Sequence, residues 1–99
     1  MLLRRETTVA VSVLIPTPLR KYTNEQDTVT VSAGTIGSLV VELEANYPGM
    51  GKRLTDDQGE LRRFINFYVN EEDIRFLEGK ETPITEGDVV SIVPSIAGG

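Results

Sequence analysis

The sequence predicts an α+β fold in which a mixed sheet of four to five strands packs against one main helix. Two observations lead to this prediction. Runs rich in β-branched residues recur along the chain, and only one segment has the apolar spacing of an amphipathic helix. Because one helix covers only one face of a sheet, the second face is expected to stay open. The 99 residues, 39% of them hydrophobic, suffice for a single core.

Residues 9–15 and 28–32 are expected to form the first two strands. In both runs alternate positions are Val or Ile, which places those side chains on one face. Pro16 and Pro18 end the first strand, since proline cannot donate a hydrogen bond to a neighbouring strand. The polar stretch 19–27 then serves as a long hairpin connection.

The only predicted helix begins after Thr35. Thr35 is positioned to cap it, and an apolar stripe recurs at helical spacing, formed by Ile36, Leu39, Val40 and Leu43. Glu42 and Glu44 fall off this stripe and are expected in solvent. Residues 46–49 end the helix, and residues 50–63 are expected to form a polar loop.

The second half of the chain predicts a third strand at 64–69, a turn at 70–73 and a short strand at 74–77. The last strand, 88–93, is apolar on both faces, so it is expected in the middle of the sheet beside the first strand. This order of elements predicts the ubiquitin-like β-grasp fold over residues 9–94. Residues 1–8 are expected to be a flexible extension.

The composition excludes several function classes. Ten basic and 15 acidic residues give a net charge of −5, which argues against nucleic acid or a membrane as partner and favours a basic protein surface. The absence of Cys and His removes thiolate chemistry and the usual general base and metal ligand. No metal site is expected, nor a signal peptide or membrane span, so a cytoplasmic location is predicted.

Three short motifs suggest chemistry that their context does not support. Residues 49–52 resemble a phosphate-binding loop but lack its full spacing. Residues 56–60 lack the alternating acidic positions of a calcium loop. The acidic run 71–73 has no nucleophile beside it, so a solvated turn is the simpler interpretation. No catalytic residues are predicted.

Phe64 and Tyr68 are candidates for a partner surface. Both alternate with Ile65, Phe67 and Val69, so they are expected on the face that the helix leaves open. Aromatic side chains grouped on an open face can mark a binding surface. The alternative, that neighbouring loops cover them, has equal support from the sequence.

Residues 95–99 are predicted to form a flexible tail that presents a carboxylate. Gly98 and Gly99 have no Cβ, so their backbone can enter a slot too narrow for a side chain. Ile96 and Ala97 precede them and are expected to contact the same partner. A frayed end of no function is the competing interpretation of the dipeptide alone.

Several stretches together resemble the ubiquitin-like sulfur-carrier family, over residues 9–99. They are the start of the fold at 11–17, the residues that open and close the helix, 33–37 and 42–48, the aromatic stretch 63–76, the start of the last strand at 87–90, and the Ala-Gly-Gly end at 97–99. The family includes the small subunit of molybdopterin synthase and the thiamine-pathway carrier. The stretch 64–76 and the helix end look most like carriers of the CysO type.

The resemblance implies a carrier that is not itself an enzyme and binds no cofactor. A ubiquitin-activating-like adenylyltransferase would use ATP to adenylate the Gly99 carboxylate, and sulfur would displace AMP to leave a thiocarboxylate. In the CysO type, the sulfur acceptor is a pyridoxal-phosphate-dependent cysteine synthase, and a metallopeptidase releases the cysteine.

Three other functions stay open at this point. The chain resembles molybdopterin synthase small subunits as well, which would imply a large catalytic partner. It could also be a protein modifier, with Gly99 joined to lysines of its targets. A plain β-grasp interaction module without C-terminal chemistry is the third alternative, because fold does not dictate function.

Overall fold

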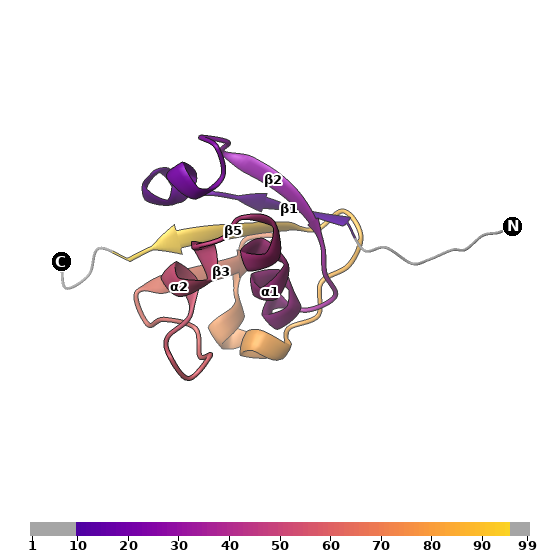
Figure 1. Cartoon of the computed structure of the whole chain (residues 1–99). Coiled ribbons are helices and arrows are strands. Elements are labelled where there is room, and N and C mark those ends of the chain that lie inside the picture. Colours follow the sequence, from indigo (N-terminus) through magenta and orange to yellow (C-terminus); the bar gives the residue numbers. More distant parts are fainter. Residues whose placement is uncertain (1–9, 96–99) are drawn as a thin grey trace, which may run out of the picture.

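The structure is a computed structural model that describes residues 10–95. Five strands form one mixed sheet in the order β2-β1-β5-β3-β4, and the helices lie on one face of it (Figure 1). The strands are β1 (Ala10–Leu14), β2 (Thr28–Ser32), β3 (Ile65–Val69), β4 (Glu72–Asp73) and β5 (Val89–Pro94). The α-helices are α1 (Ile36–Asn46) and α2 (Met50–Leu54). Three short 3-10 helices complete the set: η1 (Thr17–Tyr22), η2 (Ile74–Phe76) and η3 (Gly79–Glu81).

The last strand, β5, occupies the centre of the sheet, as predicted. It runs parallel to β1, with Val13 opposite Val90, and antiparallel to β3, with Phe67 opposite Ile92. These four side chains are at most 3% exposed, so the centre of the sheet is also the centre of the core. The topology is the ubiquitin-like β-grasp.

Helix α1 covers the core face and begins where the sequence predicts. The Thr35 hydroxyl accepts a hydrogen bond from the Ser38 N–H, and the Ser38 hydroxyl accepts one from the Thr35 N–H, each at 3.1 Å. This reciprocal pair satisfies two backbone donors at the helix start. The predicted apolar stripe is confirmed, because all four of its members are buried: Ile36, Leu39, Val40 and Leu43.

Helix α2 lies where the sequence was expected to form a loop. Met50 and Leu54 are both fully buried, so this short helix closes one end of the core. Five residues are too few to show a helical period, which is why the pattern missed it. Glu44 is exposed as predicted, but its carboxylate accepts hydrogen bonds from the N–H groups of Gly49 (3.2 Å) and Gly51 (2.7 Å) and so joins α1 to α2.

Residues 70–77 also differ from the prediction. The turn consists of Asn70 and Glu71, at positive φ angles of 49° and 78°, and is followed by the two-residue strand β4. Residues 74–77, expected as a strand, instead begin with η2, whose first turn is capped by the Asp73 carboxylate through the Arg75 N–H at 2.9 Å. The predicted hairpin of β1 and β2 is confirmed, with η1 inside its connection.

Candidate functional site

The end of the sheet where β5 finishes is the candidate site. β5 ends at Pro94, and the Ser95 N–H donates a 2.6 Å hydrogen bond to the Phe64 carbonyl. The chain therefore leaves the sheet beside the turn that leads into β3. The predicted tail residues that follow, Ile96, Ala97, Gly98 and Gly99, lie outside the described residues, as do the predicted extension 1–8 and Val9.

The two aromatic candidates are placed differently from each other. Tyr68 is a half-buried residue of β3 on the open face, opposite Ser91 of β5. Phe64 lies in the turn before β3 rather than in the strand, and 63% of its surface is exposed. In the part of the chain that the structure describes, both side chains are accessible to solvent. Their role in partner binding stays a prediction.

The register adds two apolar side chains that the sequence analysis missed. Leu14 of β1 and Val93 of β5 alternate with buried neighbours, so both point to the open face, where they are 40% and 42% exposed. Leu14, Tyr68 and Val93 form what we call the open-face patch. Leu14 and Tyr68 both lie opposite Ser91, from its two neighbouring strands. Only the order of strands in the sheet reveals this grouping, because the three residues are far apart in the sequence.

A second exposed aromatic side chain belongs to the 3-10 helix η2. Phe76, in η2, is 84% exposed. The expected strand at 74–77 would have paired this residue with the sheet. Its exposure follows from the 3-10 helix that forms there instead.

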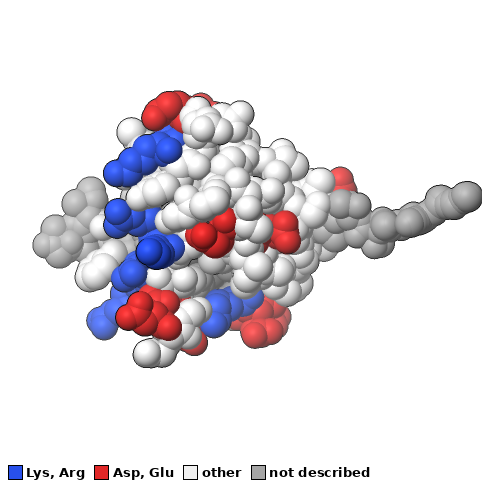
Figure 2. All heavy atoms as spheres, in the orientation of Figure 1, with Lys and Arg blue, Asp and Glu red and all other residues white. Residues whose placement is uncertain are grey.

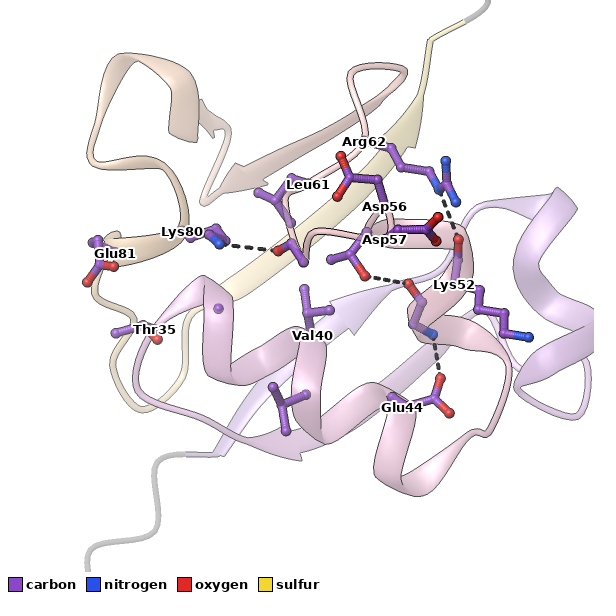
Figure 3. Close-up of a pocket in the computed structure, with 15 residues that line it drawn as sticks. Thr35, Val40, Glu44, Lys52, Asp56, Asp57, Leu61, Arg62, Lys80 and Glu81 are labelled. Carbon is purple, nitrogen blue, oxygen red and sulfur yellow. Dashed lines mark hydrogen bonds between the residues drawn. The ribbon is translucent and has the colours of Figure 1, made fainter.

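A groove of about 820 Å³ lies on the opposite, helical side of the molecule, between α1, α2, the loop 55–62 and η3 (Figure 3). Its apolar wall includes Val40, Val41 and Leu61. Lys80 reaches across it and donates hydrogen bonds to the Gly59 carbonyl at 3.2 Å and to Glu60 at 3.3 Å.

Some polar groups of this groove are held by hydrogen bonds that shape it. The Asp56 carboxylate accepts hydrogen bonds from the N–H groups of Glu60 (3.0 Å) and Gln58 (2.9 Å), which hold the pKa of that carboxyl below its ordinary value. The N–H groups of Gly49 and Gly51 are occupied by Glu44, so the stretch 49–52 is not arranged as a phosphate cradle. Within residues 10–95, no group of three or more potential metal ligands is assembled.

Comparison with known proteins decides the family. The model of the ThiS family matches residues 13–99. The chain belongs to this family. It is 50% identical to the sulfur carrier protein CysO of Mycobacterium tuberculosis over 91 residues, which are 90% of this chain and 98% of that one. The crystal structure of that CysO matches with a TM-score of 0.82 and 48% identity, over 87% of this chain and 99% of that one.

Two further relatives bear on partners and on alternative functions. A chain in the crystal structure of the BexX/CysO complex of Amycolatopsis orientalis matches with a TM-score of 0.83 and 39% identity, over 90% of this chain and 99% of that one. Small archaeal modifier protein 3 of Haloferax volcanii is 38% identical over 65 residues, 66% of this chain and 70% of that one. The resemblance drawn from the sequence, to sulfur carriers of the ubiquitin-like type, is thus confirmed.

The helices add one finding that concerns location. Among residues 10–95, no helix has the length and apolar content that crossing a membrane requires.

Proposed function

We propose that this protein is a sulfur carrier whose Gly99 carboxylate is converted to a thiocarboxylate, with cysteine synthesis as the destination of the sulfur. The observation that supports this most is the match to CysO over almost the whole of both chains. A carrier needs no catalytic side chain of its own, since its partners perform the chemistry.

The chemical steps follow from the carboxylate. A ubiquitin-activating-like adenylyltransferase transfers AMP from ATP to the carboxylate and releases pyrophosphate. A sulfur nucleophile then attacks the acyl carbon, AMP leaves, and the carbon–oxygen bond is replaced by a carbon–sulfur bond. The thiocarboxylate in turn attacks an acceptor held by a pyridoxal-phosphate-dependent cysteine synthase, and a metallopeptidase frees the cysteine. ATP is a substrate of the first partner, and the carrier itself binds no cofactor.

The position of β5 suits this function. A central strand is anchored on both sides, so the residues after Ser95 start from a fixed point at one end of the sheet. Phe64 and the open-face patch lie near that point and are our candidates for the surface that partner enzymes contact. That a homologue occurs in a complex with another protein, BexX, is consistent with such a surface. We expect the protein to act in the cytoplasm, where ATP is available.

The proposal is tested with purified protein, the activating enzyme of the same host, magnesium, ATP and sulfide. We expect release of pyrophosphate, followed by a species heavier by one oxygen-to-sulfur exchange located on Gly99. Intact mass of the protein from its host shows which residue ends the mature chain and whether a cysteine adduct is present. Failure of the activating enzyme to release pyrophosphate with this protein would reject the carrier function.

Replacement of Gly98 provides the sharpest variant. In Gly98→Ala, the added methyl group should obstruct entry of the chain into a narrow slot, and we expect kcat/KM for pyrophosphate release to fall about 100-fold, the order expected for a displaced reacting group. Ala97→Gly is the matched control and should retain activity. Equal rates for both variants and the wild type would contradict the narrow-slot argument.

A second candidate function is protein modification, favoured by the similarity to small archaeal modifier protein 3. In that case, the intact mass experiment would find target peptides joined to Gly99 through lysine, and no thiocarboxylate would be required for the linkage.

A further inference from the structure

The basic residues of this acidic protein are gathered at one end. Eight Lys and Arg residues lie within residues 10–95, and six of them belong to η1, α2 and residues 62–63, segments that lie toward the end of the sheet where β5 finishes (Figure 1). Figure 2 shows Lys and Arg side chains following one another along that side of the molecule, with some Asp and Glu side chains beside them. We call the six the basic rim: Arg20, Lys21, Lys52, Arg53, Arg62 and Arg63.

The three arginines of the rim that make hydrogen bonds are each held by the inner nitrogen of the guanidinium. Nε of Arg20 donates to the Ile15 carbonyl at 2.9 Å, which fixes the side chain against the end of β1. Nε of Arg62 donates to the Lys52 carbonyl at 2.9 Å, so the loop before β3 is tied to α2 (Figure 3).

The third arginine, Arg53, is tied to an aromatic ring. Its Nε donates to the Tyr22 hydroxyl at 2.8 Å, and its guanidinium lies 5.8 Å from the ring centroid. Lys21 lies 5.6 Å from the same centroid. The Arg53 hydrogen bond, together with both cations, lowers the pKa of the Tyr22 phenol.

Within residues 10–95, the outer nitrogens of these three arginines make no hydrogen bond, and no residue of the rim forms a salt bridge. The two other cations are paired, Arg75 with Asp73 and Lys80 with Glu60. A guanidinium that is fixed through Nε and free at its outer nitrogens presents a preorganised pair of donors for a carboxylate. Its fixed position reduces the entropy lost on binding.

The rim adjoins the point where the chain leaves the sheet. Arg62 and Arg63 directly precede Phe64, whose carbonyl accepts the hydrogen bond from Ser95. A hollow of about 490 Å³ at this point is lined by Arg62, Arg63, Phe64 and Ser95 among others. Whatever receives the residues after Ser95 must therefore lie close to these cations.

We propose that the basic rim docks against an acidic surface of the enzyme that receives the C-terminal residues, an inference that rests on the proposed function. The net charge of the chain favours a basic partner, but its cations gather at this end, beside the acidic pair Asp56 and Asp57 of the neighbouring loop. A protein surface fits better than nucleic acid, because the overall charge of −5 repels a polyanion. The rim also adjoins exposed Phe64, and arginine beside aromatic groups is typical of protein interfaces.

The test measures binding of the full-length protein to the host's ubiquitin-activating-like adenylyltransferase by calorimetry, without ATP so that no chemistry occurs. The variant is Arg53→Gln/Arg62→Gln. Its control, Ala45→Glu/Lys80→Gln, lowers the net charge by the same amount at residues outside the rim. We expect the rim variant to bind about tenfold more weakly at low salt and the control to match the wild type. The difference should vanish near about 1 M salt, where the Debye length is about 3 Å.

The outcomes separate this inference from the proposed function. Binding that depends on the arginines, without pyrophosphate release once ATP is added, would support the rim and reject activation. Pyrophosphate release with equal affinity for all three proteins would support activation and overturn the rim. Absence of any binding would also overturn it, as would arginine-dependent binding of a 20-nucleotide RNA in place of the enzyme.

A second variant guards against a folding defect. If circular dichroism shows that the first variant is unfolded, Arg20→Gln/Arg63→Gln reduces the rim by the same charge without touching Tyr22 or α2. It should weaken binding in the same salt-dependent way, and wild-type affinity of a folded second variant would overturn the inference.

Discussion

The two ends of the sheet use charge in opposite ways. Where β5 begins, carboxylates and amides are hydrogen-bonded within the fold: Asp88 accepts from Thr85 N at 2.8 Å and from the Asn70 amide at 2.9 Å, and Glu86 accepts from Ala10 N at 2.9 Å. Where β5 finishes, the arginines of the basic rim keep their outer nitrogens free within residues 10–95. We therefore expect the charged groups of the first end to stabilise the fold, whereas those of the second end are the ones that we propose contact a partner.

Among the substitutions that test this comparison, Asn70→Ala should cause the largest loss of stability. The side-chain amide nitrogen of Asn70 donates to Asp88, and the side-chain oxygen accepts from Val89 N at 3.0 Å. The backbone of Asn70 is in the left-handed conformation, which asparagine tolerates better than alanine. We expect the free energy of unfolding, measured in urea, to fall by about 2 kcal/mol. Asn66→Ala, near the other end of β3, is the control, because the Asn66 side chain makes no hydrogen bond within residues 10–95. An equal loss of unfolding free energy in both variants would contradict the difference between the two ends.

Acid should weaken the end where β5 begins. The backbone N–H of Thr85, followed by the Asn70 amide, holds the pKa of the Asp88 carboxyl below its ordinary value. A depressed pKa in the folded state contributes stability that is complete above the unfolded pKa of about 3.9 and is lost as the pH falls through the folded value.

We therefore expect Asp88→Asn to be less stable than the wild type at pH 7, with the gap narrowing toward pH 3. Urea unfolding at both pH values measures it. Asp57→Asn, whose carboxylate makes no hydrogen bond within residues 10–95, is the control and should differ little at either pH. A gap that stays constant with pH would show that the Asp88 charge does not stabilise the fold.

We expect similar backbone strain in one turn at each end of the sheet. Glu71 in the turn before β4 and Glu25 after η1 both have positive φ, 78° and 66°. Glycine adopts this conformation without steric cost but loses more entropy on folding, so we expect Glu71→Gly and Glu25→Gly each to raise thermal stability by about 0.5 kcal/mol. A gain in only one of them, measured by calorimetry, would show that one turn is held by contacts of its side chain.

Phe64→Ala should change stability least and binding most. The ring is 63% exposed, so its loss removes little buried surface, and we expect the free energy of unfolding to change by about 0.5 kcal/mol or less. Affinity for the activating enzyme should nevertheless fall severalfold. Val41→Ala, with a side chain that is 65% exposed on α1 at the opposite, helical side, is the control. Wild-type affinity of Phe64→Ala would remove this residue from the partner surface.

The sequence alone was sufficient to predict the elements in which apolar residues recur at a regular spacing. Alternation in 28–32, the apolar stripe of α1 and the Thr35 cap were all predicted, and the apolar character of 88–93 on both faces predicted a central strand. These features depend on the spacing of neighbouring residues, which a single chain displays directly. The Gly-Gly end and the family resemblance could be recognised from the sequence for the same reason.

The tertiary structure decided the features that depend on distant residues. Helix α2 exists because Met50 and Leu54 fill the core and Glu44 bonds its first turn, and none of this appears in a run of five residues. Residues 74–77 could not be a strand once Asp73 capped η2. The open-face patch and the basic rim likewise join residues from separate elements. Net charge is a sum over the sequence, but the placement of that charge depends on how the chain folds.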